Sequence, residues 1–484
     1  MIMPPLAFGR EIGAMNPVDG RPQELTREGA EALMKQAPEA QQALAAFSLE
    51  SRLKVVDDAR REWERRLNEG KLEELQSLLI KRTGYARGLI DLEFNLISQV
   101  LDSDILRANL QVSLIGGAKS IEDFVDMGQG EGILNAPAGP NLIIASGNSV
   151  VPTLIPTMVS LLTGNATILK PAAANYPGVV EALSCLSAST GEAADALRAC
   201  LTVVYMNHEG EALEYLLGQA PVGVVNFWGG EPGRTSVRMK VAGNPHMPRF
   251  FANGPMTGVA IIDEASAQEA TADGLAVDVV VYDQQLCSSP TLMVFVGGWE
   301  VGLVFGKMLG RYLDDIGSEF PLNLSDDQIF ILQGARRSLM VRGSTLLNAK
   351  DQANPWTIAL DRGKIGVDLM MKDYPSMALH VRRRFLQIVV VKTVAEAAAL
   401  ICELPSHVAY HGIDRVQTVG IALDEKNHAE ALHLLARAGV YRFIPIGDMF
   451  MRGPAEPYDG VSMASLFTYA CYARGRPTLL GERD

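Results

Sequence analysis

Apolar residues recur every three or four positions along the first part of the chain, from about Thr26 to Leu101. Between them lie mainly Arg, Glu and other polar residues. The clearest series is Leu53, Val56, Ala59, Trp63 and Leu67. This spacing places the apolar side chains on one face of a helix, so we expect a helical N-terminal region in which Gly70 ends one helix.

The pattern changes after residue 126. The stretch DMGQGEGILNAPAGP, residues 126–140, is rich in Gly and Pro and has no helical period, which predicts loops or a hairpin. Beyond it, short apolar runs alternate with helical stretches. The runs are residues 141–145, 167–170, 201–205 and 222–227, and after Gly254 residues 259–262, 291–296, 387–392 and 416–423.

Strand, helix and strand at this spacing are typical of parallel sheets with crossover helices. We therefore expect two doubly wound α/β domains. Helical stretches are expected up to Leu162, after Pro177, from Glu209 and over residues 394–402. The tail from Met451 shows no regular pattern.

Length and composition agree with two large domains. The chain has 484 residues, of which 48% are hydrophobic, so it can bury extensive sheets and is not generally disordered. Its formal charge of −13 argues against nucleic-acid binding, which needs clustered Lys and Arg. The densest basic run is Arg382 to Arg384, which we interpret as a solvated face or a basic entrance for an anionic substrate.

The cysteines indicate a reducing compartment. The chain has 5 of them, far apart and without CxxC or Cys/His spacing, so neither a disulfide framework nor a metal site is expected. The N-terminus lacks the features of a signal peptide. The most apolar stretches, 149–163 and 292–305, are interrupted by Pro or Gly and fall short of the roughly 20 residues that cross a bilayer. We expect a cytoplasmic protein without a membrane span.

Two loops stand where open α/β sheets bind ligands, at the carboxyl ends of strands. SGNSVVP, residues 146–152, follows the run at 141–145, and WGGEPG, residues 228–233, follows the run at 222–227. Helix N-termini at such ends offer free N–H groups to anions. The second loop lacks a full dinucleotide motif, so a tight strand-to-helix turn is an equal interpretation.

One cysteine differs from the others in its surroundings. Cys287 lies in VYDQQLCSSPT, residues 281–291, among small and polar neighbours that leave room around sulfur. It is either a nucleophile or a buried apolar thiol. Cys185, Cys200 and Cys402 lie in apolar patterns and are expected to be packing residues.

Three segments in order resemble the aldehyde dehydrogenase superfamily, and more closely the LuxC-type acyl-CoA reductases. They are SGNSVVPTLIPTMVSLLTGNATILKP (146–171), VNFWGGE (225–231) and YDQQLCSSP (282–290). The resemblance continues through QTVGIAL (417–423), GVYRFIPIGDMF and YDGV (439–461), and so covers the chain from about Pro140.

The resemblance implies a division of the chain into three parts. A nucleotide-binding domain, with the helical N-terminal region, takes residues 1–115 and 139–256. A catalytic domain takes 257–450. A small oligomerisation element combines 116–138 with 451–484. It therefore implies a homo-oligomer with an aldehyde-dehydrogenase-like α/β fold.

The resemblance also implies roles for single residues. Cys287 matches the nucleophile that attacks a thioester, expels coenzyme A and holds the acyl group for reduction by a nicotinamide. Asn148 matches the amide donor to the oxyanion, beside the backbone N–H of Cys287, although alone it would be read as a turn residue. Lys170 matches the lysine that reaches the adenosine ribose. Gly229, Gly230 and Gly254 are candidate cofactor contacts.

Departures from the family pattern narrow the reaction. Ala173 lies three residues after Lys170, at a position where NAD-using members often carry an acid. A carboxylate there would repel the 2′-phosphate of NADP, so its absence permits NADP. Phe251 or Ala252 stands where hydrolytic members carry a glutamate base. The glutamate that holds the nicotinamide ribose in many relatives is also not evident.

We therefore predict NADPH-dependent reduction of an acyl thioester, either acyl-CoA or an acyl-carrier protein, to an aldehyde. We expect the acyl group to be fatty, and NADH is the other permitted cofactor. One alternative is an aldehyde dehydrogenase that forms an acid or acyl-CoA. The other is a binding protein that has kept the fold without the activity.

Overall fold

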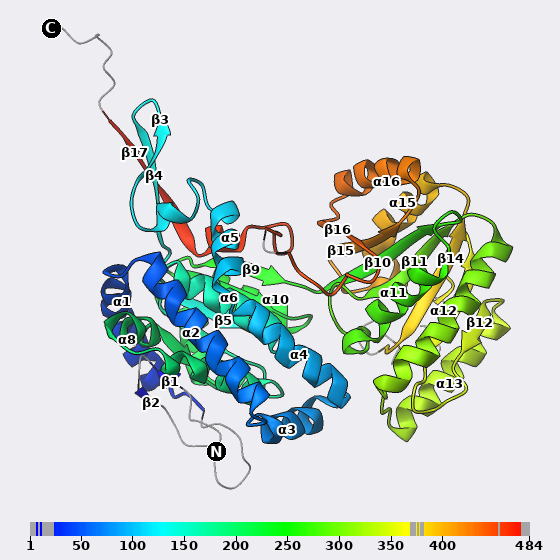
Figure 1. Ribbon diagram of the computed structural model, residues 1–484, viewed down its shortest axis with the longest axis horizontal. Coiled ribbons are helices and arrows are strands. Elements are labelled where there is room, and N and C mark those ends of the chain that lie inside the picture. Colours follow the sequence, from blue (N-terminus) through cyan, green and yellow to red (C-terminus); the bar gives the residue numbers. More distant parts are fainter. Residues whose placement is uncertain are drawn as a thin grey trace. The chain divides into compact units, whose positions relative to one another are not determined.

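The computed structural model describes residues 6–7, 10–11, 24–367, 374, 377, 382–453 and 455–475. Its contacts divide the chain into two compact units, each with a sheet of its own (Figure 1). Unit 1 comprises Met1–Thr83, Asp91–Asn253 and Gly453–Asp484, and unit 2 comprises Gly84–Ile90 and Gly254–Arg452.

The N-terminal region is helical, as predicted. Polar side chains begin three of its helices: Thr26, Ser48 and Asp102 each accept a backbone N–H of the first turn. Gly70 has a φ of +69° and follows the second helix, as expected for a residue that ends a helix. The helices are α1 (Arg27–Ala45), α2 (Leu49–Asn68), α3 (Glu73–Thr83), α4 (Arg87–Val100) and α5 (Ser103–Ser113).

The sheet of unit 1 has seven strands in the order β2-β1-β7-β6-β5-β8-β9, parallel from β7 to β9. Its central strands are buried, as parallel strands between two helix layers must be. The strands are β1 (Leu6–Ala7), β2 (Arg10–Glu11), β5 (Asn141–Ile144), β6 (Thr167–Lys170), β7 (Leu201–Val203), β8 (Val224–Trp228) and β9 (Arg249–Asn253). The helices are α6 (Val151–Leu162), α7 (Tyr176–Ser184), α8 (Glu192–Ala199), α9 (Glu211–Gly218) and α10 (Gly233–Ala242).

The sheet of unit 2 also has seven strands, in the order β12-β13-β14-β11-β10-β15-β16, with only β12 antiparallel to its neighbour. The strands are β10 (Met256–Asp263), β11 (Pro290–Val296), β12 (Thr345–Asn348), β13 (Thr357–Arg362), β14 (Phe385–Val391), β15 (Arg415–Ala422) and β16 (Arg442–Pro445). The helices are α11 (Glu269–Val280), α12 (Trp299–Glu319), α13 (Asp326–Val341), α15 (Val394–Glu403) and α16 (Glu425–Arg437). The prediction of two doubly wound sheets is confirmed, but the helices α11, α12, α13 and α16 and the strands β12, β13 and β16 were not predicted.

A third, smaller sheet has the order β17-β4-β3 and belongs to unit 1. Its hairpin, β3 (Val125–Gly128) and β4 (Glu131–Pro137), is one of the two alternatives, loops or a hairpin, that the sequence predicted for this stretch. The tail strand β17 (Thr468–Arg474) was not predicted; it follows the short helix α17 (Met463–Leu466) and pairs antiparallel along the whole of β4. Residues 476–484 of the predicted oligomerisation element lie outside the described residues.

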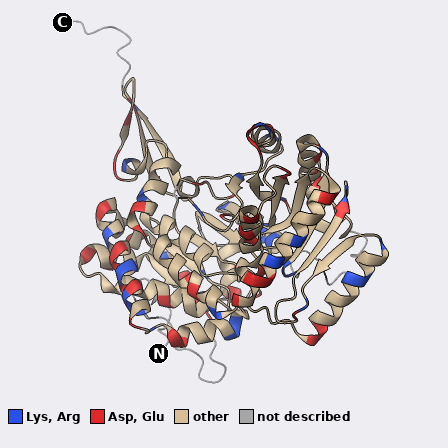
Figure 2. Ribbon diagram, turned by 45° about the vertical axis from the view of Figure 1, so that its right-hand side comes forward, with Lys and Arg blue, Asp and Glu red and all other residues tan. Residues whose placement is uncertain are grey.

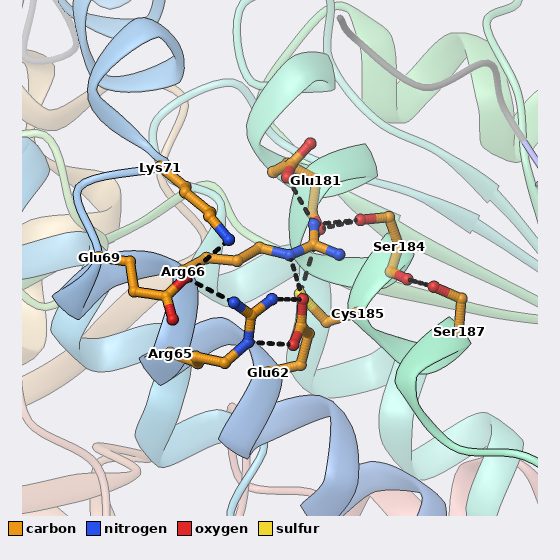
Figure 3. A network of polar contacts seen from close by, with 9 residues as sticks. All are labelled: Glu62, Arg65, Arg66, Glu69, Lys71, Glu181, Ser184, Cys185 and Ser187. Atoms are coloured by element: carbon orange, nitrogen blue, oxygen red, sulfur yellow. Dashed lines mark hydrogen bonds and ion pairs between the residues drawn. The ribbon is translucent and has the colours of Figure 1, made fainter.

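The charged residues gather on the helices, while the sheets carry few of them (Figure 2). Figure 3 shows how such residues link two helices of unit 1. Arg66 of α2 donates to Glu181 of α7 at 2.6 Å and to Ser184 Oγ at 2.9 Å, and it also pairs with Glu62. Across the described residues, every helix is too short or too polar to cross a bilayer.

Candidate active site

Three loops of unit 1 leave the same edge of its sheet. Strands β6, β5 and β8 are parallel neighbours, and Ile144 lies level with both Lys170 and Phe227. The chain therefore emerges at one level at Lys170, at the SGNSVV loop and at Gly229. A Cβ added to Gly147 would lie 3.4 Å from the Ala172 Cβ, so the loops after β5 and β6 touch. The structure thus brings Asn148, Lys170, Gly229 and Gly230 to one edge.

Asn148 is held by its own loop. Ser146 Oγ donates to Asn148 Oδ1 at 2.6 Å, which fixes the amide with its oxygen toward Ser146. The next two residues are held by Glu93 of α4, whose carboxylate accepts from Ser149 Oγ and from the backbone N–H of Val150. Glu93 is 1% exposed, and this burial raises its pKa. Sequence reasoning missed Glu93, because a single acid within a helical pattern has no distinguishing neighbour.

Lys170 ends β6 with a half-buried side chain. Burial lowers the pKa of its amine, and the nearby charge of Glu24 opposes that shift. The Glu24 carboxylate is itself held by the backbone N–H of Asn207 at 2.8 Å. The amine therefore lies where a negatively charged ligand group would relieve the cost of its desolvation.

The WGGEPG loop is tied to the C-terminal segment by a chain of hydrogen bonds. Trp228 Nε1 donates to Asn226 Oδ1 at 2.6 Å, Asn226 donates to Asn253 Oδ1 at 2.9 Å, and Asn253 donates to Asp459 Oδ2 at 2.6 Å. The Trp228 ring also meets the Tyr458 ring edge-on at 5.1 Å. These contacts hold the WGGEPG loop against the YDGV segment, which is far from it in sequence.

The glycines of this region serve different needs. A Cβ on Gly229 would lie only 3.0 Å from the Phe227 ring, so close packing is a sufficient reason for a glycine at this position. This agrees with the interpretation of the loop as a tight strand-to-helix turn. Gly230 is exposed and precedes the N-terminus of α10. Gly254 has a φ of +90°, which strains any other residue, and follows β9 as the first residue of its stretch of unit 2. An exposed backbone, a helix N-terminus and the Lys170 amine are groups that fit a dinucleotide.

Cys287 lies in unit 2, in a tight turn just before β11. Leu286 O accepts the Ser289 N–H at 3.0 Å, and Ser289 Oγ accepts the Leu286 N–H at 3.3 Å, so the turn is closed twice around the cysteine. A Cβ on Gly258 of β10 would lie 2.1 Å from Ser288 O, so only glycine lets the strand lie under this turn. Gly258 is a residue that sequence reasoning missed.

Exposure separates Cys287 from Cys185 and Cys200, but not from Cys471, which is half-buried as well. The Cys287 side chain is half-buried, whereas Cys185 and Cys200 are buried, and burial raises the pKa of each to about 12. The prediction that these two are packing residues is confirmed. The same prediction for Cys402 is wrong, because Cys402 is exposed at the end of α15, although its neighbour Ile401 is buried.

The backbone before Cys287 is strained. Tyr282, Asp283 and Gln284 have φ values of 53°, 50° and 63°, in the left-handed region that side chains rarely adopt. Gln284 is fixed from both sides: its amide donates to Pro290 O at 2.7 Å, and its oxygen accepts the Phe385 N–H at 2.7 Å. The turn is therefore bound to both β11 and β14.

A buried ion pair completes this support. Arg384 Nη2 lies 2.5 Å from Asp283 Oδ1, with the two side chains 0% and 2% exposed. Arg384 also donates to Asn354 Oδ1 at 2.8 Å and to Phe320 O at 2.5 Å. Burial raises the pKa of Asp283, and the Arg384 charge opposes that shift.

The interpretation of residues 382–384 as a solvated basic run is wrong. Arg382 and Arg384 are 2% and 0% exposed, and only Arg383 is half-buried. Arg382 lies against the rings of Phe385 and Tyr410, at 5.8 and 5.9 Å, and donates to Ala409 O. Arg382 and Arg384 thus lie in the interior of unit 2, where each meets a hydrogen-bond acceptor or an aromatic ring.

Comparisons with known sequences agree on one family. A family model described as Acyl-CoA reductase (LuxC) matches residues 44–469. Long-chain acyl-protein thioester reductase 2 of Photobacterium leiognathi is 25% identical over 240 residues, which cover 49% of this chain and 48% of that protein. A long-chain acyl-protein thioester reductase of Photorhabdus luminescens is 27% identical over 215 residues, or 44% and 43%. The chain thus spans about half the length of the curated relatives it matches.

Solved structures agree on the fold. An oxidoreductase from Marinobacter aquaeolei superposes with a TM-score of 0.72 at 12% identity, over 98% of each chain. A NAD-dependent benzaldehyde dehydrogenase from Corynebacterium glutamicum gives 0.67 at 14% identity, again over 98% of each. The predicted aldehyde-dehydrogenase-like fold is confirmed.

Proposed function

Because the chain belongs to the LuxC family of acyl-CoA reductases, we propose that it reduces an acyl thioester to an aldehyde through an acyl-cysteine intermediate. The observation that carries this proposal is the setting of Cys287: a partly exposed thiol at the tip of a turn that a buried ion pair and a strained backbone hold in place. Sites of stored strain and buried charge are typical of reaction centres.

In the proposed reaction, Cys287 begins as the thiolate. Its Sγ attacks the thioester carbonyl, the carbonyl oxygen takes the negative charge, and the bond to the leaving thiol breaks as that thiol leaves and takes up a proton. A new thioester then joins the acyl group to Cys287. A nicotinamide, when bound, would supply a hydride. The acyl carbon held on Cys287 Sγ would accept it, and the carbon–sulfur bond would then break to release the aldehyde and the Cys287 thiolate.

We assign the oxyanion to Asn148 and to the backbone N–H of Cys287. Ser146 donates to the oxygen of the Asn148 amide and so orients this side chain, whose nitrogen is the atom that can donate to an oxyanion. Loss of one such donor typically lowers the rate about 100-fold or more.

We assign the nicotinamide dinucleotide to unit 1, with Lys170, Gly229 and Gly230 as contacts and NADPH as the form used. Gly254, where the chain passes into unit 2, is a further candidate contact. The absence of an acid at Ala173 supports NADPH. Phe251 and Ala252 of β9 offer no carboxylate to activate water, which favours transfer to a thiol over hydrolysis to an acid.

We also propose that the small sheet joins copies of the chain. Phe124, Met127, Tyr469 and Tyr472 are 47–57% exposed on or beside β3 and β17, the two edge strands. Exposed aromatic side chains on a sheet edge are typical of a subunit interface. Light scattering of the purified chain tests this, and a monomer at all concentrations would contradict it.

The central experiment is intact-protein mass spectrometry with a panel of acyl-CoAs and without reductant. We expect one acyl group added at Cys287 and none in Cys287→Ala, which should also make no aldehyde while it still binds nucleotide. Cys185→Ala is the matched control, because that thiol is buried, and it should behave as the unmodified chain. Undiminished turnover in Cys287→Ala would end the proposal, and acid formed without coenzyme A would favour a hydrolytic dehydrogenase instead.

A further inference from the structure

An arginine from the N-terminal helices reaches the loop after β6. Arg82, in the last turn of α3, donates from Nη1 to Ala173 O at 3.0 Å. Ala173 is exposed and lies three residues beyond Lys170. In doubly wound nucleotide-binding units, the residues just beyond the second strand contact the adenosine ribose, and a basic residue there accommodates a 2′-phosphate. Here β5 is the first such strand and β6 the second.

The arginine is held in place by the packing of its helix. Leu79 of α3 is fully buried, and a Cβ on Gly178 of α7 would lie 3.2 Å from it. Because α7 begins just after the loop at Ala173, the same contact fixes both partners of the Arg82 hydrogen bond. Arg82 itself is half-buried.

Its donors are not consumed by an acid. The guanidinium has five N–H groups, and the bond to Ala173 uses one of them. Within the described ranges, no carboxylate forms an ion pair with Arg82. The carboxylate that acts on Lys170 is Glu24, which is held by Asn207 on the side of β7. Two cations, Arg82 and Lys170, thus flank a loop that lacks an acid of its own.

We propose that Arg82 binds the 2′-phosphate of NADPH and so sets the preference of this protein for NADPH over NADH. The inference rests on the proposed use of a nicotinamide dinucleotide, and it adds the residue that distinguishes the two forms. A guanidinium suits a phosphate because two parallel N–H groups meet two oxygens, which a lysine cannot reproduce. NADH carries only a hydroxyl at that position and gains nothing from the charge.

The test is calorimetric binding of two fragments, adenosine 2′,5′-bisphosphate and adenosine 5′-monophosphate, to the full chain. They differ only in the 2′-phosphate, and neither can react, so the result is independent of the aldehyde-forming activity. We expect the unmodified chain to prefer the bisphosphate. Arg82→Gln should weaken bisphosphate binding roughly 10- to 100-fold, the size of a lost charge-assisted hydrogen bond, and leave monophosphate binding within about twofold.

Two further variants separate recognition from structure. Lys81→Gln removes the neighbouring exposed cation of the same helix and should change neither affinity. Ala173→Glu places an acid beside Arg82 at an exposed position, and should weaken the bisphosphate at least as much as Arg82→Gln while it spares the monophosphate.

The outcomes are distinct. Equal weakening of both fragments by Arg82→Gln would mean that Arg82 only orders the loop, and would overturn the proposal. An unchanged bisphosphate affinity, or no preference in the unmodified chain, would overturn it as well. If the preference depends on Arg82 while Cys287 takes up no acyl group, this inference stands and the proposed reaction fails.

Discussion

The loop that holds Asn148 and the turn that holds Cys287 are stabilised in different ways. The loop lies at the carboxyl end of a strand, where the fold itself presents backbone N–H groups, and a single buried carboxylate, Glu93, satisfies two donors there. The turn lies at the amino end of β11, where the fold provides no such groups. It depends on three left-handed residues and a buried ion pair.

The conformations of the loop and of the turn therefore differ in their free-energy cost. A loop at a carboxyl edge needs little beyond a cap, because its geometry follows from the sheet. A turn in the left-handed region costs of order 1–3 kcal/mol per residue and persists only when its surroundings enforce it. In unit 2, charged groups in the interior hold the turn in this conformation. Mutations around Cys287 should therefore change the free energy of unfolding more than mutations around Asn148.

The largest effect should come from breaking the ion pair. Arg384→Met leaves the buried Asp283 carboxyl without its ion-pair partner, which we expect to lower the free energy of unfolding by about 3–5 kcal/mol. Urea unfolding followed by circular dichroism measures this loss. Asp283→Leu combined with Arg384→Met should recover part of it, since no lone charge then remains.

The matched control is Arg383→Met, the half-buried neighbour, which should change the free energy of unfolding by less than about 1 kcal/mol. Equal losses from both arginine variants would show that the pair is not what stabilises the turn.

The second effect concerns the pH dependence of unit 2. Asp278 of α11, the helix that leads to the turn, accepts the N–H groups of Gly447 and Met449, and burial raises its pKa to about 7. The unfolded chain ionises this group near its ordinary value of 3.8. Its stabilising contribution is therefore complete below that value and is lost as the pH rises to about 7, with a slope of about 1.4 kcal/mol for each step of one in pH.

Asp278→Asn should flatten this part of the profile of unfolding free energy between pH 4 and pH 7. Asp273→Asn, an exposed residue of the same helix, should leave the profile as it is. A profile that keeps its slope in Asp278→Asn would contradict the assignment.

The smallest effect should come from the loop of unit 1. Glu93→Ala leaves Ser149 and Val150 without their acceptor, at a cost of about 1–3 kcal/mol, whereas Glu93→Gln keeps one acceptor and should cost about 1 kcal/mol. The same urea unfolding measures both, with Gln99→Ala on the exposed face of α4 as the control. A cost for Glu93→Ala above that of Arg384→Met would reverse the comparison between the two regions.

Much of the fold could be predicted because it depends on local periodicity. The runs at 141–145 and 167–170 became β5 and β6, and the helical spacing around Trp63 became α2. The strand β17 could not be predicted, because its partner β4 lies more than 300 residues away in sequence and its own residues are mostly exposed, without the alternation of a half-buried strand. The helices α12 and α13 and the strands β12 and β13 were not predicted, because their sequence contains no distinctive motif.

The candidate residues also divide into those with a local signal in the sequence and those without one. Cys287 and Asn148 were found because their neighbours in sequence form a motif. Arg82, Glu93 and Gly258 were not found, because each acts on a residue that is distant in the chain.

Neighbouring residues are enough to indicate the two largely parallel sheets, the loops at their edges and Cys287 as the candidate nucleophile, because each depends on a local pattern. Which charged side chains are buried depends instead on how segments that are distant in the chain pack together. Arg384 is fully enclosed beside Asp283, although the three arginines in a row suggested solvent. The reason is physical: the cost of burying a charge depends on the partner that meets it in space, and that partner lies about a hundred residues away.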